Sequence, residues 1–261
     1  MELPTNRRGD RLPPIVRKMA FVLPNLLTTA NLFLGFFSIV AATRYNWEAS
    51  ALAILMAAFS DGLDGRVARM TKTQSRFGEE YDSMSDLVSF GVAPALLMYF
   101  WALSPYGRLG YIACFFYLTC AALRLTRFNV QKQNVEKRYF QGLASPVAAC
   151  SVATAVLFYE DIQSMSAFKD KYMLAIMFIL AINMISTFRY RSFKDVRFVK
   201  SQKNFAYLIV GIVAMLIVAR KPEHYLFPLN FTYVLSGPVF EIFRFFSKLL
   251  RKPIKARPKR P

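Results

Sequence analysis

Hydrophobic residues form long runs along this chain, and the charged residues gather in short clusters between the runs. Most runs approach the roughly 20 residues that a helix needs to cross a bilayer. The pattern predicts eight spans, of which the fifth is short and the eighth contains proline and glycine. Their approximate limits are 26–42, 49–68, 83–103, 109–128, 145–159, 171–188, 204–219 and 225–243. We therefore predict an all-α integral membrane protein, a polytopic bundle of about eight transmembrane helices.

Charge divides the chain into three regions. A basic N-terminal segment covers 1–22 and ends in either a short interfacial helix over 15–23 or a plain linker. A transmembrane domain covers 23–245, and a basic tail covers 246–261. If the spans alternate in direction, 34 Lys and Arg residues divide unequally, and all but six lie on the side of both termini. The exceptions are Arg44, Arg108, Lys169, Lys171, Arg220 and Lys221.

Basic residues favour the cytoplasmic side of a membrane, so both termini are expected in the cytoplasm. The net charge of +18 is spread over the loops between apolar runs, which favours an anionic membrane surface over nucleic acid as its partner. The three cysteines lie within apolar runs and are interpreted as packing residues. His224 is the single histidine, so a catalytic mechanism here must work without a histidine cluster.

Four aspartates stand out because apolar sequence flanks them on both outer sides. Asp61 and Asp64 are three residues apart, and Asp82 and Asp86 are four apart, so each pair would project from one face of a helix. Carboxylates in such sequence are costly and indicate function. The alternative, ordinary helix caps, does not explain two aspartates at the end of an apolar helix. Clustered carboxylates repel one another, and oxygen ligands suit Mg²⁺, Mn²⁺ or Ca²⁺ better than zinc.

Small and basic residues accompany the aspartates at fixed distances. Each has an ordinary alternative, namely helix packing, a turn or an interfacial arginine. The complete pattern reads Asp61-x-x-Asp64-Gly65-x-x-Ala68-Arg69, then eight residues, then Gly78-x-x-x-Asp82-x-x-x-Asp86. It resembles the signature of the CDP-alcohol phosphotransferase family, with every position and spacing intact.

The resemblance implies an integral membrane enzyme, usually a homodimer, with a six-helix core around two divalent cations. These would be Mg²⁺ or Mn²⁺, with Ca²⁺ as a substitute or inhibitor. It implies that an alcohol displaces CMP from a CDP-linked donor. By the same resemblance, Asp61, Asp64, Asp82 and Asp86 hold the metals, and Asp86 is also the catalytic base. The residues implied near the CDP group are Asp61, Gly65, Ala68, Arg69 and Gly78.

Further segments are similar to the branch of this family that uses serine as its alcohol. They are PNLLTTANLFLGFFSI (24–39), EYDSMSDLVSFGVAPA (80–95), ALRLTRFN (122–129) and GLASP (142–146). This similarity covers roughly residues 20–150. It implies that the phosphatidyl group of CDP-diacylglycerol passes to the hydroxyl of L-serine, giving phosphatidylserine and CMP. It also implies a bacterial cytoplasmic (inner) membrane as the location.

Two groups of polar residues near the predicted site each have two possible roles. Arg124, Arg127 and Asn129 lie at the cytoplasmic end of the fourth span, where an arginine can bind the carboxylate of serine. They are expected to bind the acceptor, and the alternative is ordinary positive-inside topology. A polar line on the first span contacts either substrate or a neighbouring helix. It consists of Asn25, Thr28 and Asn31.

Other functions remain alternatives at this point. The same chemistry with another acceptor, such as glycerol 3-phosphate or inositol phosphate, would call for a larger basic pocket. A divalent-cation transporter would also place carboxylates in a membrane, but it would not need the glycines, Ala68 and Arg69 at fixed distances. A catalytically silent scaffold would not need the four aspartates.

Overall fold

The computed structural model describes residues 14–71, 75–131, 140–161, 169–186, 188–190 and 222–250, and nearly all of them are helical. The helical segments are α1 (Pro14–Thr43), α2 (Trp47–Thr71), α3 (Arg76–Asp86), η1 (Leu87–Val92), α4 (Ala93–Met98), η2 (Tyr99–Leu103), η3 (Ser104–Tyr106), α5 (Arg108–Gln131), α6 (Ser145–Asp161), α7 (Lys169–Ile185) and α9 (Pro222–Leu250). Two short strands, β1 (Phe140–Gln141) and β2 (Arg189–Tyr190), pair antiparallel, with Phe140 opposite Tyr190.

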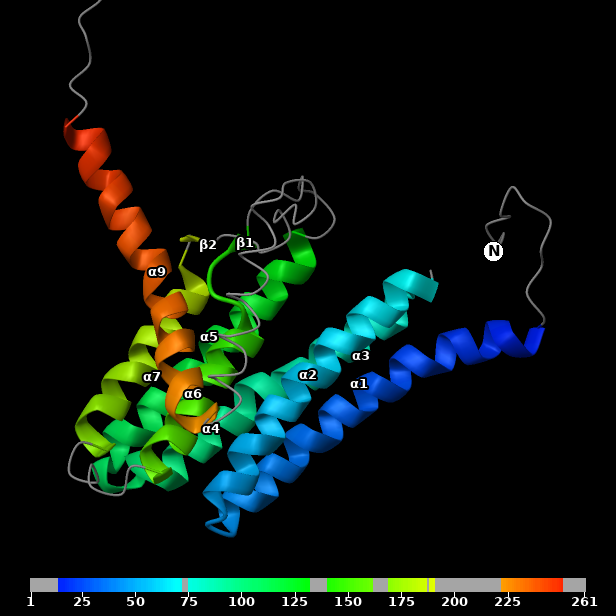
Figure 1. Cartoon of the computed structure of the whole chain (residues 1–261), viewed down its shortest axis with the longest axis horizontal. Helices are drawn as coiled ribbons and strands as arrows, with labels where there is room; N and C mark the ends of the chain where they lie inside the picture. The colour runs from blue at the N-terminus through cyan, green and yellow to red at the C-terminus, as the bar shows by residue number, and fades with distance from the viewer. Residues whose placement is uncertain are drawn as a thin grey trace, which may run out of the picture.

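The described helices from α1 to α7 build one bundle (Figure 1). α1 and α2 lie side by side because a short turn joins them. The segments from α3 to η3 follow one another without a break and form a third long helix, Arg76–Tyr106. α5, α6 and α7 complete the bundle, and α9 packs mainly against α6. This is the helical core that the sequence predicted.

The first six predicted spans are helices in the structure, and the eighth lies within α9. The seventh, 204–219, lies outside the described residues. In the described part, three helices are long and apolar enough to cross a membrane, and a shorter apolar helix covers Tyr172–Ile185. The three are Val22–Thr43, Arg76–Tyr106 and Arg108–Val130. α6 has only 17 residues, and α2 carries two aspartates within its apolar run.

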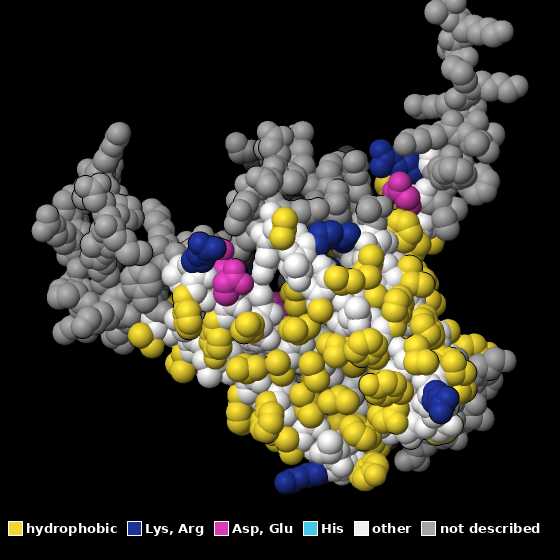
Figure 2. Space-filling view, turned by 180° about the vertical axis from the view of Figure 1, so that it is seen from behind, with side chains coloured by type: hydrophobic (Ala, Val, Ile, Leu, Met, Phe, Trp, Pro, Cys, Tyr) yellow, Lys and Arg dark blue, Asp and Glu magenta, His cyan; other side chains and the backbone are white. Residues whose placement is uncertain are grey.

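Hydrophobic side chains cover the outside of the bundle. Figure 2 shows them over the middle of one face, whereas the described charged side chains lie toward its ends. Phe33 and Phe59 each expose 63% of their surface. A protein surrounded by water rarely exposes apolar surface on this scale. Together with the spanning helices, this surface identifies an integral membrane protein.

Small residues fill much of the interior. Ala51, Ala57 and Ala153 are among the buried residues that let neighbouring helices approach closely. α1 lies very close to η1 at Gly35, where a Cβ atom would lie 2.8 Å from the Cα atom of Ser89. A side chain at Gly35 would therefore push α1 away from the helix that carries the second aspartate pair.

The third long helix widens directly after α3. In η1 the hydrogen bonds are π-helical, and the Ala93 N–H donates to the Val88 carbonyl five residues earlier. Pro94 has no N–H to offer to the Phe90 carbonyl, and its ring would crowd that carbonyl in a regular α-helix. The buried hydroxyl of Tyr117 on α5 donates to the Phe90 carbonyl at 3.2 Å. The wider turn is thus supported by a partner from outside the helix.

Two helix starts differ from the prediction. α1 is continuous from Pro14, so 15–23 and the first span form one helix instead of two, with Pro24 inside it. Its N-terminal end extends past the ends of α2 and α3 in Figure 1. α3 begins at Arg76, well before the predicted third span of 83–103, because Ser75 caps it. Ser75 Oγ accepts a hydrogen bond from the Gly78 N–H at 3.0 Å.

Candidate active site

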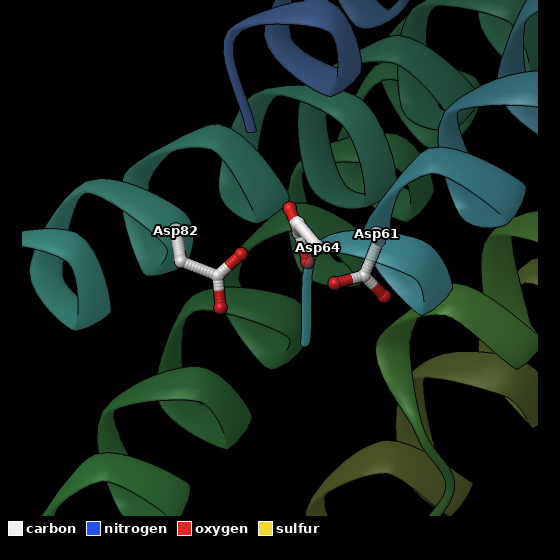
Figure 3. Close-up of side chains that lie close together, drawn as sticks. All are labelled: Asp61, Asp64 and Asp82. Carbon is white, nitrogen blue, oxygen red and sulfur yellow. The ribbon is translucent and has the colours of Figure 1, made fainter. Parts of the chain in front are cut away.

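Three aspartates from α2 and α3 converge on one point. Asp61 and Asp64 on α2 point toward Asp82 on α3 (Figure 3). One carboxylate oxygen from each residue lies within 4.8 Å of the other two. Asp64 is buried, and Asp61 and Asp82 are partly exposed. The site therefore has both a buried side and a side that a water-borne group can reach.

Asp86 borders this cluster one helical turn after Asp82. It is buried, and its charge interacts with those of Asp61 and Asp82. Nδ2 of Asn31 on α1 donates to Oδ1 of Asp86 at 3.1 Å. Asp86 is thus near the three clustered carboxylates but has one oxygen held by a different helix.

α1 also contacts the first aspartate pair. The Thr28 hydroxyl lies 3.0 Å from Oδ2 of Asp64 and donates to it. The same hydroxyl lies 3.1 Å from the Pro24 carbonyl, so one proton serves two acceptors. The polar line on the first span therefore contacts neighbouring helices. Two of its members, Thr28 and Asn31, donate hydrogen bonds to predicted metal ligands on those helices. Its third member, Asn25, lies against the first turn of α3.

Three serines anchor α1 to the helices that carry the aspartates. Their hydroxyls donate to α1 carbonyls: Ser60 to Leu27 at 2.9 Å, Ser85 to Thr28 at 3.1 Å and Ser89 to Asn31 at 2.9 Å. In an apolar surrounding such bonds join helices. Sequence reasoning missed these serines. For Ser85 and Ser89, the available signal was their spacing of four within the same apolar helix as the second aspartate pair.

Arg124 of α5 faces the acidic cluster. Its charge interacts with those of Asp86 and Asp61. Its Nη1 donates to Oγ of Ser145, the first residue of α6, at 2.8 Å. Its guanidinium also lies 5.9 Å from the centre of the Phe128 ring, while its buried Nε has no hydrogen-bond partner among the described residues. Arg124 therefore has a donor with no partner among the described residues, and its charge interacts with two of the four carboxylates.

Arg127 has different surroundings, although it lies one turn away on the same helix. Its guanidinium donates to three carbonyls at the end of α7: Ile185 at 2.8 Å, Met184 at 3.3 Å and Ser186 at 3.3 Å. These carbonyls lack partners within a helix because the helix ends there. The structure thus gives this predicted acceptor residue the role of a helix cap.

Gly142 belongs to the same junction. Its φ of +80° is favourable only for glycine. A Cβ atom here would lie 2.5 Å from the Met184 carbonyl oxygen and 2.7 Å from Nη2 of Arg127. The neighbouring N–H groups of Gly142 and Leu143 donate to Phe188 and Asn183 carbonyls. This junction fixes the segment that leads into Ser145, the partner of Arg124.

Asn129 is the third residue of the predicted acceptor set. Its Nδ2 donates to Oγ of Ser83 at 2.8 Å, which joins the end of α5 to α3 beside Asp82. Of the three residues in this set, Arg124 faces the carboxylates, Asn129 contacts the neighbouring helix, and Arg127 is engaged by α7.

The small residues of the motif differ in their surroundings. Gly65 is exposed, and a Cβ atom there would have nothing within 4 Å, so there is open space directly beside Asp64. Ala68 is partly buried one turn further along α2, and Arg69 lies in the same helix. Gly78 packs against α1, since a Cβ atom there would lie 3.3 Å from Oδ1 of Asn25. It lies in the first turn of α3 and not in the connection before it.

The donor atoms of this site fit a hard divalent cation. The clustered groups are carboxylates, whose oxygens suit Mg²⁺ or Mn²⁺, and neither histidine nor cysteine belongs to the cluster in the described part. Among the described side chains, Arg124 is the positive partner of these carboxylates, so four ionised carboxylates would leave a surplus of negative charge. Bound cations would remove that surplus.

Comparisons with known proteins agree with this geometry. The CDP-alcohol phosphatidyltransferase family profile matches residues 21–188, which cover the helices from α1 to α7 except for the first residues of α1. A relative from Helicobacter pylori (strain J99), named CDP-diacylglycerol–serine O-phosphatidyltransferase, is 33% identical over 223 residues, 85% of this chain and 92% of its own. A Mycobacterium leprae protein of the same name is 40% identical over 136 residues, 50% of this chain and 45% of its own.

An archaeal relative extends the comparison to a different lipid class. The archaetidylserine synthase of Methanothermobacter thermautotrophicus is 36% identical over 172 residues, 64% of this chain and 69% of its own. Each of these relatives has a name that specifies serine as the alcohol. The aspartates that converge on α2 and α3 lie within the region that the family profile matches. This chain belongs to the CDP-alcohol phosphatidyltransferase family.

Proposed function

We propose that this protein transfers the phosphatidyl group of CDP-diacylglycerol to the hydroxyl of L-serine, giving phosphatidylserine and CMP. The observation that carries the proposal is a carboxylate cluster with Arg124 beside it, in a membrane bundle that spans most of a relative named for this reaction. No relative reported above is named for a phosphorylated acceptor, so serine is favoured over glycerol 3-phosphate and inositol phosphate.

Asp61, Asp64, Asp82 and Asp86 would hold two divalent cations, Mg²⁺ or Mn²⁺, with Ca²⁺ as a substitute or inhibitor. When bound, such ions neutralise the pyrophosphate and the charge that develops on departing CMP. The chain itself supplies the shape of the site. The open space beside Gly65 leaves room for the CDP group, next to Asp61, Ala68 and Arg69, with Gly78 on the facing helix.

The acceptor would enter from the side of Arg124. Its guanidinium is suited to the serine carboxylate, and Ser145 holds it in place. Asn129 would border the same pocket from the end of α5. As the hydroxyl oxygen attacks phosphorus, its proton would pass to Asp86. Because Asn31 engages Oδ1 of Asp86, the other carboxylate oxygen is the one proposed to accept it.

The proposed setting is the bacterial inner membrane, with both termini in the cytoplasm and a homodimer as the assembly. The uneven distribution of basic residues supports the orientation. Single cysteines at Arg66 and Arg76, in a cysteine-free background, should react with a reagent that acts from the cytoplasmic side. A cysteine at Arg108 should react only from the outer side. The reverse pattern would overturn the orientation without affecting the assigned reaction.

Acceptor competition tests the function directly. Purified protein with CDP-diacylglycerol and Mn²⁺ or Mg²⁺ would be offered radiolabelled serine, inositol, glycerol 3-phosphate and inositol phosphate in separate reactions. We expect a labelled lipid and CMP only with serine, and neither product with the Asp82→Asn variant. A labelled lipid from another acceptor would overturn the serine assignment. Metal transport by proteoliposomes without CMP release would favour the transporter instead.

A further inference from the structure

We propose that Thr28 and Asn31 of α1 are positioning residues for the metal site, which hold Asp64 and Asp86 in the orientation that cation binding requires. The proposal rests on the proposed role of the aspartates as metal ligands. It concerns a helix, α1, that carries none of those ligands. Each of the two α1 side chains donates a hydrogen bond to one aspartate pair: Thr28 to Asp64 and Asn31 to Asp86.

The contact between Asn31 and Asp86 is the stronger of the two. Asn31 has no exposed surface, and its Nδ2 lies 3.1 Å from Oδ1 of Asp86. Its own Oδ1 is buried without a hydrogen-bond partner among the described residues. An amide turned the other way would aim that oxygen at an ionised carboxylate and repel it. The orientation with the NH₂ group toward Asp86 is therefore the attractive one.

The contact between Thr28 and Asp64 is shared. The hydroxyl has one proton, and the carbonyl of Pro24 lies about as close as Oδ2 of Asp64. The bond to the carboxylate is charge-assisted and is favoured over the neutral carbonyl. Because the proton is shared, we expect removal of this hydroxyl to have a smaller effect than removal of the Asn31 amide.

The backbone of α1 is held firmly at the same two residues. The carbonyl of Thr28 accepts from Ser85, and the carbonyl of Asn31 accepts from Ser89, both on the helix that carries Asp86. Gly35 keeps the two helices in close contact one turn further along. The two donor side chains therefore start from a fixed backbone. Residues that orient metal ligands in this way typically change metal affinity or activity by about 10- to 100-fold when they are replaced.

Mn²⁺ binding measured by electron paramagnetic resonance tests the proposal on the detergent-purified full chain. Asn31→Leu should weaken Mn²⁺ binding by about 10- to 100-fold, and Thr28→Val by less, while Thr28→Ser should retain wild-type affinity because it keeps the hydroxyl. Once Mn²⁺ is saturating, the serine KM should stay near that of wild type. A general packing defect would not produce this separation.

Ser38→Ala is the matched control. It removes a buried hydrogen bond of 2.8 Å between α1 and α2, to Ser50, about 15 Å along the helix from Thr28. It should lower thermal stability without changing Mn²⁺ affinity. Wild-type Mn²⁺ affinity in both Asn31→Leu and Thr28→Val would overturn the positioning role. If Asn31→Leu does not fold, equal affinities of Thr28→Val and Thr28→Ser would overturn it. Absence of Mn²⁺ binding by wild type would instead refute the metal site itself.

Discussion

Two polar clusters lie on the same bundle, and they differ in whether the protein itself supplies partners for their polar groups. At the junction of α5 and α7, the guanidinium of Arg127 meets three backbone carbonyls, so the donors and acceptors compensate one another. Between α2 and α3, four carboxylates lie near one another, and Arg124 interacts with two of them, Asp61 and Asp86, so the acidic groups outnumber their basic partners among the described side chains. A balanced cluster can be explained by folding alone. An unbalanced cluster costs stability and is explained by what it binds.

The largest effect is expected from removing a carboxylate of the unbalanced cluster. Asp61→Asn, Asp64→Asn and Asp82→Asn should each lower kcat by at least about 1,000-fold, since each would remove a group that holds charge-neutralising cations. In EDTA the same variants should unfold at the wild-type temperature or above it, because repulsion among the carboxylates is relieved. Loss of activity together with a lower unfolding temperature in EDTA would show instead that these carboxylates stabilise the fold.

Arg124→Lys should have the next largest effect. A lysine keeps the charge but loses the planar pair of donors that fits a carboxylate. An interaction worth about 1.5–3 kcal/mol predicts a serine KM raised roughly 10- to 100-fold, with the KM for CDP-diacylglycerol almost unchanged. Steady-state kinetics with each substrate varied in turn would measure both. A raised donor KM with an unchanged serine KM would instead make Arg124 a phosphate ligand.

Arg127→Lys should act on stability and much less on catalysis. A lysine cannot reach all three carbonyls at the end of α7, and the unpaired groups would destabilise the fold by about 1–3 kcal/mol. The unfolding temperature of the detergent-solubilised protein should fall, while the serine KM changes by less than about 3-fold. A serine KM that rises as much as in Arg124→Lys would show that both arginines bind the acceptor.

Gly142→Ala tests the junction of α5 and α7 with a change that removes no charge. The backbone conformation costs an alanine about 1 kcal/mol or more, and its Cβ would also crowd the Met184 carbonyl. We expect a lower unfolding temperature and kinetic constants near wild type, as for Arg127→Lys. A selective loss of serine affinity would indicate that the junction also positions Ser145 and Arg124 for binding.

Much of the fold could be predicted because a helix needs a run of roughly 20 apolar residues to cross a bilayer, and such runs are visible in the sequence. Six spans were found from apolar runs alone, and both aspartate pairs were placed on adjacent helices from their spacing. The start of α3 was missed because it depends on a capping serine outside the apolar run. The widened turn after α3 was missed because it depends on Tyr117, which approaches from another helix.

The sequence by itself determined the membrane class of the protein, the helices of its core and the aspartates at its site. These follow from local properties: the length of apolar runs, and residue spacing along one helix. Only the tertiary structure separated Arg124 from Arg127, and only it showed that Thr28 and Asn31 contact the aspartates. The two arginines have the same chemistry and nearly the same position in the sequence. Their roles differ because hydrogen bonds depend on which neighbouring helix each side chain meets.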